Sequence, residues 1–494
     1  MKIKFWDEME YEHKILCIFL LVHFFVWVGI SLVRTVLPTD ALEGIYWGSL
    51  HDFGTPKHPP FAGWVTYWVY NIFKSDLSIY VVSQLCVVFG FYFIYKLARK
   101  FLDVKTSVLS VVAMEGCWVY GYITGYYGFN PDVILLFFLP LLTYIFCKCM
   151  EENSPKNWIL LGLVAGVCFL NKYQTALIIL PMAIWAFMFK RETFKNKYFY
   201  LSVLLAFLVF LPHLLWLIRY EFFPILYFEG ELSDDSWVGH ITAPLKFLIV
   251  QMSVVIGSFV IFGLLKWKQK SPFKLAGNLD REKVWFLLLF ALCPLIIHLI
   301  MGFSAGGTMR PRWGFEFLYL TGIMLFYFFP PKEISKEDML YTLKASFTVM
   351  LIILLSLGSL LMVEKNYRSR YPVAVVRNDL MKFWHEKFDT PLKYWGGYIE
   401  WTLPLVIYGD DKTDCILDTN GYKNPWIDED DLKKSGILVV DRTIEHVKNE
   451  VRKSCPYLDD DYVVTPVEYK FTLTNALNMP REYTIYYYIV PPMK

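Results

Sequence analysis

Long hydrophobic segments separated by short polar loops dominate the chain up to about residue 363. A helix that crosses the hydrocarbon core of a bilayer needs about 20 predominantly apolar residues. Segments that reach or approach this length predict about eleven membrane-spanning helices, at 14–36, 78–97, 105–124, 132–149, 158–170, 174–190, 198–218, 244–266, 283–303, 314–331 and 341–363. The segment 158–170 is short for a span. It and the next segment, 174–190, are either two spans, a tight hairpin or a shallow re-entrant pair.

The distribution of lysine and arginine predicts the orientation of these helices, because cytoplasmic loops carry an excess of both. With a cytoplasmic N-terminus, the basic residues gather in the inner loops, for example at Lys96–Lys105 and Lys266–Lys274. The opposite loops are poorer in positive charge, and the residues after the last span lie outside. The outer loops are then 37–77, 125–131, 171–173, 219–243 and 304–313.

From about Glu364 the long hydrophobic segments give way to a mixed pattern. The segment Asn378–Phe388 has the pattern of a helix. Runs rich in β-branched and aromatic residues predict strands at Val373–Val376, Leu403–Tyr408, Ile437–Val440 and Tyr483–Val490. We therefore expect an α-helical polytopic membrane domain over residues 1–363 and a small C-terminal α/β extracytoplasmic domain over residues 364–494.

The composition agrees with a membrane protein and excludes two classes of site. Hydrophobic residues make up 56% of the chain and charged residues 19%, against about 25% charged residues in soluble domains. The formal net charge of +2 and the absence of a basic stripe give no reason to expect a nucleic-acid partner. The nine cysteines lack the spacing of a zinc site. Whether Cys415 and Cys455 form a disulfide stays open, because it depends on an oxidising compartment.

Two aspartates in the predicted outer loops are candidates for catalysis. Asp40 follows the first span, where a carboxylate meets a lipid head group and an aqueous acceptor together. There it is placed to act as general base when an acceptor hydroxyl attacks a sugar carbon. Asp132 is a candidate second carboxylate that faces Asp40, orients the acceptor or contributes to a metal site. The structural alternatives are a helix-capping residue for Asp40 and a first-turn residue stabilised by the helix dipole for Asp132.

Cationic residues in the same outer loops are candidates for binding a phosphate. Arg310 and Arg312 directly precede a span on the side where positive charge is disfavoured, and guanidinium groups bind phosphate in bidentate fashion. Lys172 interrupts an apolar stretch, where a lysine is usually paired, snorkelling or functional. With Lys57 and His58 these residues would neutralise a phosphate leaving group. The alternatives are snorkelling for Lys172 and interfacial anchoring for the two arginines.

These motifs, in this order, resemble the GT-C superfamily of polyprenyl-phosphate-dependent glycosyltransferases. The resemblance is strongest to the bacterial branch related to protein O-mannosyltransferases and the lipid A aminoarabinose transferases. Motifs that match the family are Asp40 followed by His58-Pro59-Pro60, then Asn130-Pro131-Asp132, Leu170-Asn171-Lys172-Tyr173-Gln174 and, in part, Arg312-Trp313. Three positions depart from the family pattern: Ala41 replaces a glutamate, Lys57 an aspartate and Arg312 a histidine.

The resemblance implies an inverting glycosyltransferase of a bacterial inner (plasma) membrane. The donor would be a sugar linked to polyprenyl phosphate, and the acceptor a protein, lipid A or another glycan in contact with membrane lipid. Asp40 would act as the base with help from Asp132. The carrier phosphate would be held by Lys172, Tyr173, Arg310 and Arg312, with Lys57 and His58 at the entrance of the site.

No cofactor is assigned from the sequence, and a divalent cation is an open alternative. Two other functions remain open as well: a secondary transporter or lipid flippase, and a non-catalytic assembly protein whose tail docks a partner. Transporter folds usually show internal repeats and helices broken in corresponding halves. Neither pattern is visible in this sequence.

Overall fold

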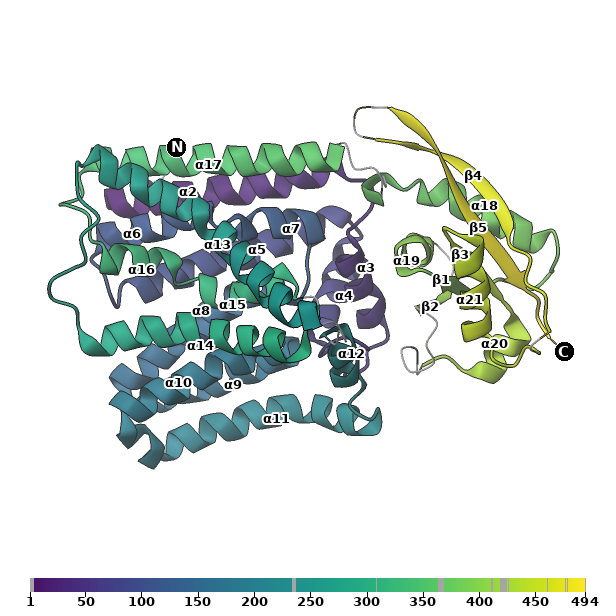
Figure 1. Cartoon of the computed structure of the whole chain (residues 1–494), viewed down its shortest axis with the longest axis horizontal. Helices are drawn as coiled ribbons and strands as arrows, with labels where there is room; N and C mark the ends of the chain where they lie inside the picture. The colour runs from purple at the N-terminus through teal and green to yellow at the C-terminus, as the bar shows by residue number, and fades with distance from the viewer. Residues whose placement is uncertain are drawn as a thin grey trace.

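A bundle of helices and a smaller part built on a β-sheet make up the computed structural model of the chain (Figure 1). The described residues are 4–232, 237–307, 309–362, 368–409, 412–417, 424, 426–459, 461–475, 477 and 479–493. The helices of the bundle are α1 (Lys4–Glu8), α2 (Tyr11–Gly29), α3 (Thr39–Ser49), α4 (Phe61–Phe73), α5 (Asp76–Ala98), α6 (Val104–Val112), α7 (Tyr122–Tyr127), α8 (Pro131–Glu152), α9 (Pro155–Asn171), α10 (Ala176–Phe189), α11 (Lys197–Arg219), α12 (Phe223–Leu232), α13 (Trp237–Lys268), α14 (Arg281–Ala305), α15 (Phe315–Leu318), α16 (Thr321–Phe328) and α17 (Lys336–Met362).

The predicted spans are helical, but their exact number is not confirmed. Among the described residues, seven segments are long and apolar enough to cross a membrane: Tyr11–Val33, α5, α8, α11, α13, α14 and α17. An eighth span would combine Val104–Gly116 with Trp118–Tyr127 across a bend of 73°. The difference from eleven arises at short helices, because α9 and α10 are apolar but below the length of a span. The predicted segment 314–331 likewise divides into the short helices α15 and α16.

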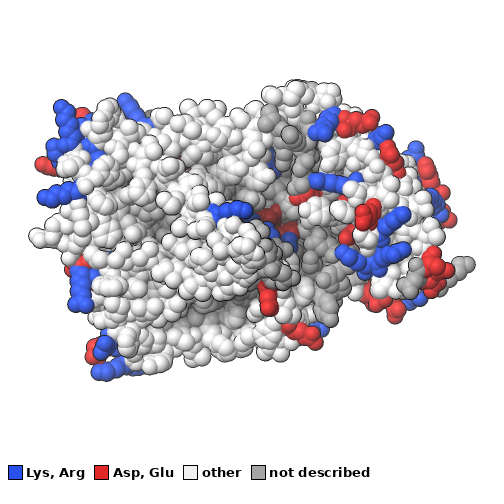
Figure 2. All heavy atoms as spheres, viewed as in Figure 1, with Lys and Arg blue, Asp and Glu red and all other residues white. Residues whose placement is uncertain are grey.

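The distribution of charge along the bundle fits a membrane-embedded surface. Figure 2 shows uncharged atoms over most of the bundle, with charged side chains gathered at its far end and over the sheet-containing part. Where the two parts meet, the surface is hollowed, and positive and negative side chains lie together in the hollow (Figure 2). Charged groups inside such a protein are expensive and usually mark a functional site.

Two helices, α3 and α4, lie within the first predicted outer loop, where the hydrophobic pattern predicts no span. Their backbones pass close to each other at Gly48 and Gly63, since a Cβ atom at Gly48 would lie 2.1 Å from the carbonyl oxygen of Gly63. A side chain at this position would therefore force the helices apart. The close packing matters for function because α3 carries Asp40 in its first turn.

The sheet-containing part has the predicted α/β class. Its five-stranded mixed sheet has the order β2-β1-β3-β5-β4, in which β1 is parallel to β2 and β3, and β5 is antiparallel to β3 and β4. Its elements are α18 (Val373–His385), β1 (Tyr394–Gly397), α19 (Ile399–Ile407), β2 (Asp414–Leu417), α20 (Glu429–Ser435), β3 (Ile437–Asp441), α21 (Ile444–Ser454), β4 (Val467–Thr474) and β5 (Pro480–Val490).

Two of the predicted strands are wrong, because Val373–Val376 opens α18 and Leu403–Tyr408 lies mainly in α19. Both segments are rich in apolar residues because their helices bury them, and a short buried helix cannot be told from a strand by such a run. The expected domain boundary at 363/364 falls in 363–367, outside the described residues. Cys415 and Cys455 form no disulfide with each other among the described residues, and they belong to different hydrophobic clusters of the sheet.

Tyr46 joins the sheet-containing part to α3. Its hydroxyl donates to the carbonyl oxygen of Cys415 at 2.9 Å and accepts from the amide of Cys415 and the indole Nε1–H of Trp426, each at 3.2 Å. A second contact is made by Tyr408, whose hydroxyl donates to Asp76 Oδ2 at 2.8 Å and accepts from the amide of Leu37 at 2.9 Å. The helix that carries Asp40 is thus fixed from both ends by groups of the C-terminal part.

Replacing Tyr46 by phenylalanine is expected to lower the free energy of unfolding by about 1–3 kcal/mol, because it leaves buried backbone groups of Cys415 without their partner. Thermal unfolding of the purified protein in detergent measures the change, and hydrogen exchange at β2 locates it. Tyr92→Phe, at an exposed position on α5, is the matched control. Equal stability of the two variants would contradict the role of Tyr46.

Candidate active site

A cavity of about 480 Å³ opens at the end of the bundle that faces the sheet-containing part. Its lining comes from the predicted outer loops and the helix ends beside them, in the segments 40–66, 129–132, 172–177, 224–228 and 298–313. All eight predicted site residues contribute to the lining: Asp40, Lys57, His58, Asp132, Lys172, Tyr173, Arg310 and Arg312. The structure therefore brings together residues that are up to 272 positions apart in the sequence.

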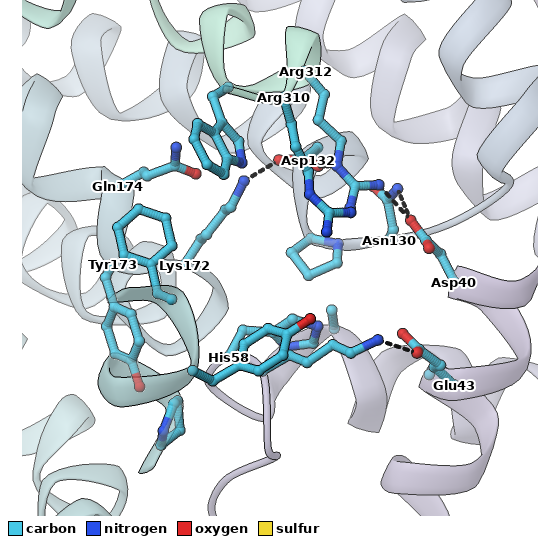
Figure 3. A pocket seen from close by; sticks show the side chains of 18 of the residues that line it. Asp40, Glu43, His58, Asn130, Asp132, Lys172, Tyr173, Gln174, Arg310 and Arg312 are labelled. Carbon is cyan, nitrogen blue, oxygen red and sulfur yellow. Dashed lines mark hydrogen bonds and ion pairs between the residues drawn. The ribbon is translucent and has the colours of Figure 1, made fainter. Parts of the chain in front are cut away.

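Alternating positive and negative side chains form a continuous chain across this cavity (Figure 3). Arg312 Nη1 lies 2.7 Å from Asp40 Oδ2, and its Nε lies 3.3 Å from Asp132 Oδ2. The other oxygen of Asp132 pairs with the ammonium group of Lys172. Asn130 completes the arrangement by donating from Nδ2 to Asp40 Oδ2 at 2.9 Å. The series Asp40–Arg312–Asp132–Lys172, called here the charge chain, places a cation against each of the two carboxylates.

Both carboxylates of the charge chain lie in the first turn of a helix. Asp40 follows Pro38 and Thr39 at the start of α3, and Asp132 follows Pro131 at the start of α8. Asn130 caps α8, since its side chain accepts from the amide of Val133 at 3.0 Å. Free N–H groups and the helix dipole favour negative charge at these positions. Asp40 therefore does not cap α3, whose N-cap is Pro38, whereas Asp132 has the first-turn position of its structural alternative. Both helix starts aim their carboxylates into the cavity.

A second ion pair lies one helical turn further along α3. Lys57 Nζ pairs with Glu43, which is almost fully buried. The ammonium group also lies over the ring of Trp47, 5.5 Å from its centroid. Glu43 is not among the site residues predicted from the sequence. Its position three residues after Asp40 places the two on one helix face, which would have identified it once a helix was predicted there.

Some residues that line the cavity were not predicted from the sequence, and one predicted residue, Tyr173, makes a different contact from the expected one. Asn130, Gln174 and Tyr227 line the cavity without having been predicted. The ring of Tyr173 lines the cavity, but its hydroxyl is hydrogen-bonded to His213 Nε2 at 2.7 Å. That contact orients the ring and directs the hydroxyl toward α11 rather than toward a ligand.

The surroundings of these groups shift their pKa values. Burial alone would raise the pKa of Asp40, but Arg312, Asn130 and Lys57 outweigh burial and hold that pKa below its ordinary value. Burial lowers the pKa of Lys57 and Arg312, and the nearby carboxylates more than reverse this, so both pKa values are raised. Burial, together with the positive charges of Lys57 and Lys172, lowers the pKa of His58 to about 4. The hydrogen bond to the carbonyl of Pro59 acts in the opposite direction but is outweighed. His58 therefore adds no positive charge at neutral pH.

A divalent cation was left open by the sequence, and this cavity offers few ligands for one. Within the described residues, no group of three or more His, Cys, Asp or Glu side chains is arranged to hold a metal ion. A cation between Asp40 and Asp132 would need the oxygen atoms that Arg312 already contacts. The donor set therefore favours a guanidinium group over a metal between the two carboxylates.

Comparisons with known proteins support the family resemblance. Residues 57–216 match the family described as dolichyl-phosphate-mannose-protein mannosyltransferase. The lipopolysaccharide core galacturonosyltransferase RgtA of Rhizobium johnstonii is 25% identical over 310 residues, which cover 59% of this chain and 60% of RgtA. The lipid A galacturonosyltransferase RgtD of the same organism is 23% identical over 257 residues, which cover 50% of this chain and 52% of RgtD. The match thus spans less than two thirds of these relatives.

A solved structure matches nearly the whole chain. The crystal structure of ArnT from Cupriavidus metallidurans, bound to undecaprenyl phosphate, superposes with a TM-score of 0.65 at 12% identity. The superposition covers 96% of this chain and 97% of ArnT. The chain therefore has an ArnT-like fold. The family match and the relatives given above, together with this fold, bear out the resemblance to the GT-C superfamily.

The charge chain predicts strong coupling between Arg312 and Asp40. Arg312→Gln is expected to lower the free energy of unfolding by about 2–4 kcal/mol, because it leaves two partly buried carboxylates without their shared cation. Adding Asp40→Asn removes one of them, so the double variant should be more stable than the sum of the single effects by about 1–3 kcal/mol. Thermal and denaturant unfolding of the four proteins measures this coupling. Strictly additive losses would show that the pair does not interact.

The lowered pKa of His58 predicts a loss of stability in acid. Its imidazole binds a proton near pH 6.5 in the unfolded chain but only near pH 4 in the folded protein. Between these values the unfolded state binds more protons, so stability falls as the pH falls, by at most about 1.4 kcal/mol per pH unit. Comparing the pH dependence of unfolding for the wild type and His58→Gln isolates this contribution. Parallel curves from pH 7 to pH 4.5 would contradict it.

Proposed function

We propose that the protein transfers a sugar from a polyprenyl-phosphate carrier to an acceptor at the outer face of the membrane. The single observation that carries this proposal is that Asp40 shares one cavity with Lys172, Arg310 and Arg312. Glycosyl transfer from a lipid phosphate needs a base for the acceptor and cations for the leaving phosphate. The names of RgtA and RgtD and the lipid bound to ArnT describe those proteins, and they support this assignment of class.

The proposed reaction is a single inverting displacement. The acceptor oxygen attacks the anomeric carbon of the donor sugar while the bond from that carbon to the phosphate oxygen breaks. Asp40 accepts the proton of the acceptor hydroxyl, and the electron pair of the broken bond stays on the polyprenyl phosphate. Lys172, Arg310 and Arg312 stabilise the negative charge that develops there. Asp132 holds Lys172 and Arg312 in place through its two oxygens.

Donor binding would also activate the base. In the structure Arg312 pairs with Asp40 and holds its pKa below the ordinary value, which makes Asp40 a weak base. A donor phosphate competes for the same guanidinium group, because bidentate arginine–phosphate contacts are strong. When Arg312 turns toward the phosphate, Asp40 loses part of its neutralisation and its pKa rises. The base is then strongest when the donor is present.

The arrangement of the chain in the membrane is part of the proposal. We assign residues 1–363 to a catalytic membrane domain and residues 364–494 to an extracytoplasmic domain in a bacterial inner membrane. The basic loops between the helices and the position of the cavity beside the sheet-containing part support this orientation (Figures 1 and 2). In that position the C-terminal part would cap the cavity or present the acceptor, which is a protein, lipid A or another glycan.

Asp40→Asn tests the proposed base. The amide keeps the shape of the side chain but cannot accept the proton, so transfer should fall by about 10²–10⁴-fold. Mass analysis of cell-envelope glycans from a strain that lacks the protein, complemented with each variant, measures transfer whichever molecule is the acceptor. The purified variant should remain folded and still bind polyprenyl phosphate.

Asp52→Asn is the matched control, because Asp52 lies in the same outer loop and its side chain accepts from the amide of Phe53, apart from the charge chain. It should restore the glycans as the wild type does. Full restoration by Asp40→Asn would remove the mechanism, and unchanged glycans in the strain that lacks the protein would remove the proposed function.

A further inference from the structure

A second hollow lies at the end of the bundle opposite to the cavity, where α13 ends and α17 begins (Figure 1). Its volume is about 770 Å³, and it opens between the end of α13, the turn that follows it and α17. Among the described residues, no aspartate or glutamate lines it. The hollow is called here the basic hollow, and its charged and aromatic lining residues are Lys266, Lys268, Lys270, Trp267, Phe273 and Tyr341.

One face of α13 and the residue that follows on it provide most of this lining. Lys266, Trp267 and Lys270 follow Gly263 by three, four and seven positions, which is the spacing of a single helix face. A Cβ atom at Gly263 would meet only a ring atom of Phe273, at 3.9 Å, so this glycine leaves space in the hollow. Lys270 has a φ of 49°, a left-handed conformation in which glycine is the usual residue at a helix end. A lysine is therefore placed at the hollow against the local backbone preference.

The carboxylates at the start of α17 interact with Lys268 and its neighbour. Lys268 Nζ lies 2.8 Å from Asp338 Oδ1. The other oxygen of Asp338 accepts from Gln269 Nε2 at 3.0 Å. Glu337, the exposed residue before Asp338, also interacts with Lys268. These contacts join the end of α13 to the first turn of α17 and neutralise the charge of Lys268.

Lys266 carries a buried charge that no carboxylate of the described residues neutralises. It is 1% exposed, and its ammonium group donates to the carbonyl oxygen of Pro330 at 2.9 Å. The rings of Phe262 and Phe273 also lie near it, with centroids 6.0 and 5.9 Å from Nζ. Within the described part of the chain, neither Lys266 nor Lys270 forms an ion pair. A buried ammonium group without a counter-ion is unfavourable, so an anion in the hollow would be bound favourably.

The surroundings of the basic hollow indicate which anion fits. Both α13 and α17 are long and apolar enough to cross a membrane, so the hollow lies where two spans reach the membrane surface. Trp267 and Phe273 are 76% and 63% exposed, and exposed aromatic residues at the ends of spans are typical of the membrane interface. An anion that also carries hydrocarbon would contact both these rings and the lysines. The excess of lysine in inner loops does not explain the hollow by itself, because Lys266 is buried rather than solvated.

We propose that the basic hollow binds the phosphate group of an anionic phospholipid. The lipid belongs to the leaflet at this end of the bundle, which is the cytoplasmic leaflet in the orientation proposed above. Its phosphate accepts from Lys266 and Lys270, and its glycerol and acyl chains contact Trp267 and Phe273. A zwitterionic lipid has the same phosphate but adds an ammonium group, which the two lysines repel. This site goes beyond the proposed function and does not depend on glycosyl transfer.

Native mass spectrometry of the delipidated full chain, titrated with phosphatidylglycerol or phosphatidylcholine, tests the site. Phosphatidylglycerol should bind at least about fivefold more tightly than phosphatidylcholine. Lys270→Gln should weaken the binding of phosphatidylglycerol about fivefold, because it removes one of the two lysines that hold the phosphate. Gly263→Leu should weaken it by a similar factor, since the larger side chain fills the hollow and leaves every charge in place. Inorganic phosphate should not displace the lipid, because it makes no contact with the aromatic rings.

Lys274→Gln is the matched control, since Lys274 is exposed in the same loop and does not line the basic hollow. It removes the same charge and should leave the affinity for phosphatidylglycerol unchanged. Equal affinity of the wild type for the two lipids would overturn the proposal. So would an equal loss in Lys274→Gln and Lys270→Gln, or displacement of the lipid by inorganic phosphate. If Gly263→Leu does not fold, the comparison of the two lysine variants decides.

Discussion

Two carboxylates from distant parts of the chain share one partly buried cavity only because cations lie between them. Asp40 and Asp132 lose water solvation on burial, and without Arg312 between them they would also repel each other. An uncompensated charge in such a site is unfavourable. The first turns of α3 and α8 and the segment before α15 must therefore stay in contact with one another. The same constraint that stabilises this end of the bundle therefore assembles the groups to which the proposed glycosyl transfer is assigned.

This constraint also explains the contribution of the C-terminal part. The helix α3 carries Asp40 and Glu43 toward the cavity and Tyr46 toward the sheet, where the Tyr46 hydroxyl contacts both backbone groups of Cys415. Helices α3 and α4 are too short to be held by a bilayer and depend on packing at Gly48 and Gly63 and on this contact. A C-terminal part that fixes the helix of the proposed base is consistent with the proposed reaction, which needs precise placement of Asp40.

The sequence predicts those features that hydrophobic length and local motifs determine. The helical segments, the α/β class of the tail and the gathering of eight site residues follow from such signals. The number of spans does not follow, because length alone cannot tell a complete span from helices such as α9 and α10, which are apolar but short. The segments Val373–Val376 and Leu403–Tyr408 resemble strands in the sequence because a short apolar run does not extend far enough to show the periodicity of a helix.

The gaps in the predicted site have a similar cause. Glu43 escapes prediction because α3 lies in a loop by hydropathy, so its helical spacing from Asp40 gives no signal. The hydroxyl of Tyr173 is expected at the phosphate, but its contact with His213 joins two helices that only the folded bundle brings together. Arg312 is expected to bind phosphate, and its bridge between the two aspartates depends on a packing of three segments that no local motif encodes.

The most direct test of the proposed site is a structure of the protein with polyprenyl phosphate bound, determined by cryo-electron microscopy in a lipid nanodisc. The charge chain predicts the phosphate within hydrogen-bonding distance of Arg310, Arg312 or Lys172, in the cavity that contains Asp40. A phosphate bound at the opposite end of the bundle, or in a site that Asp40 does not reach, would contradict it.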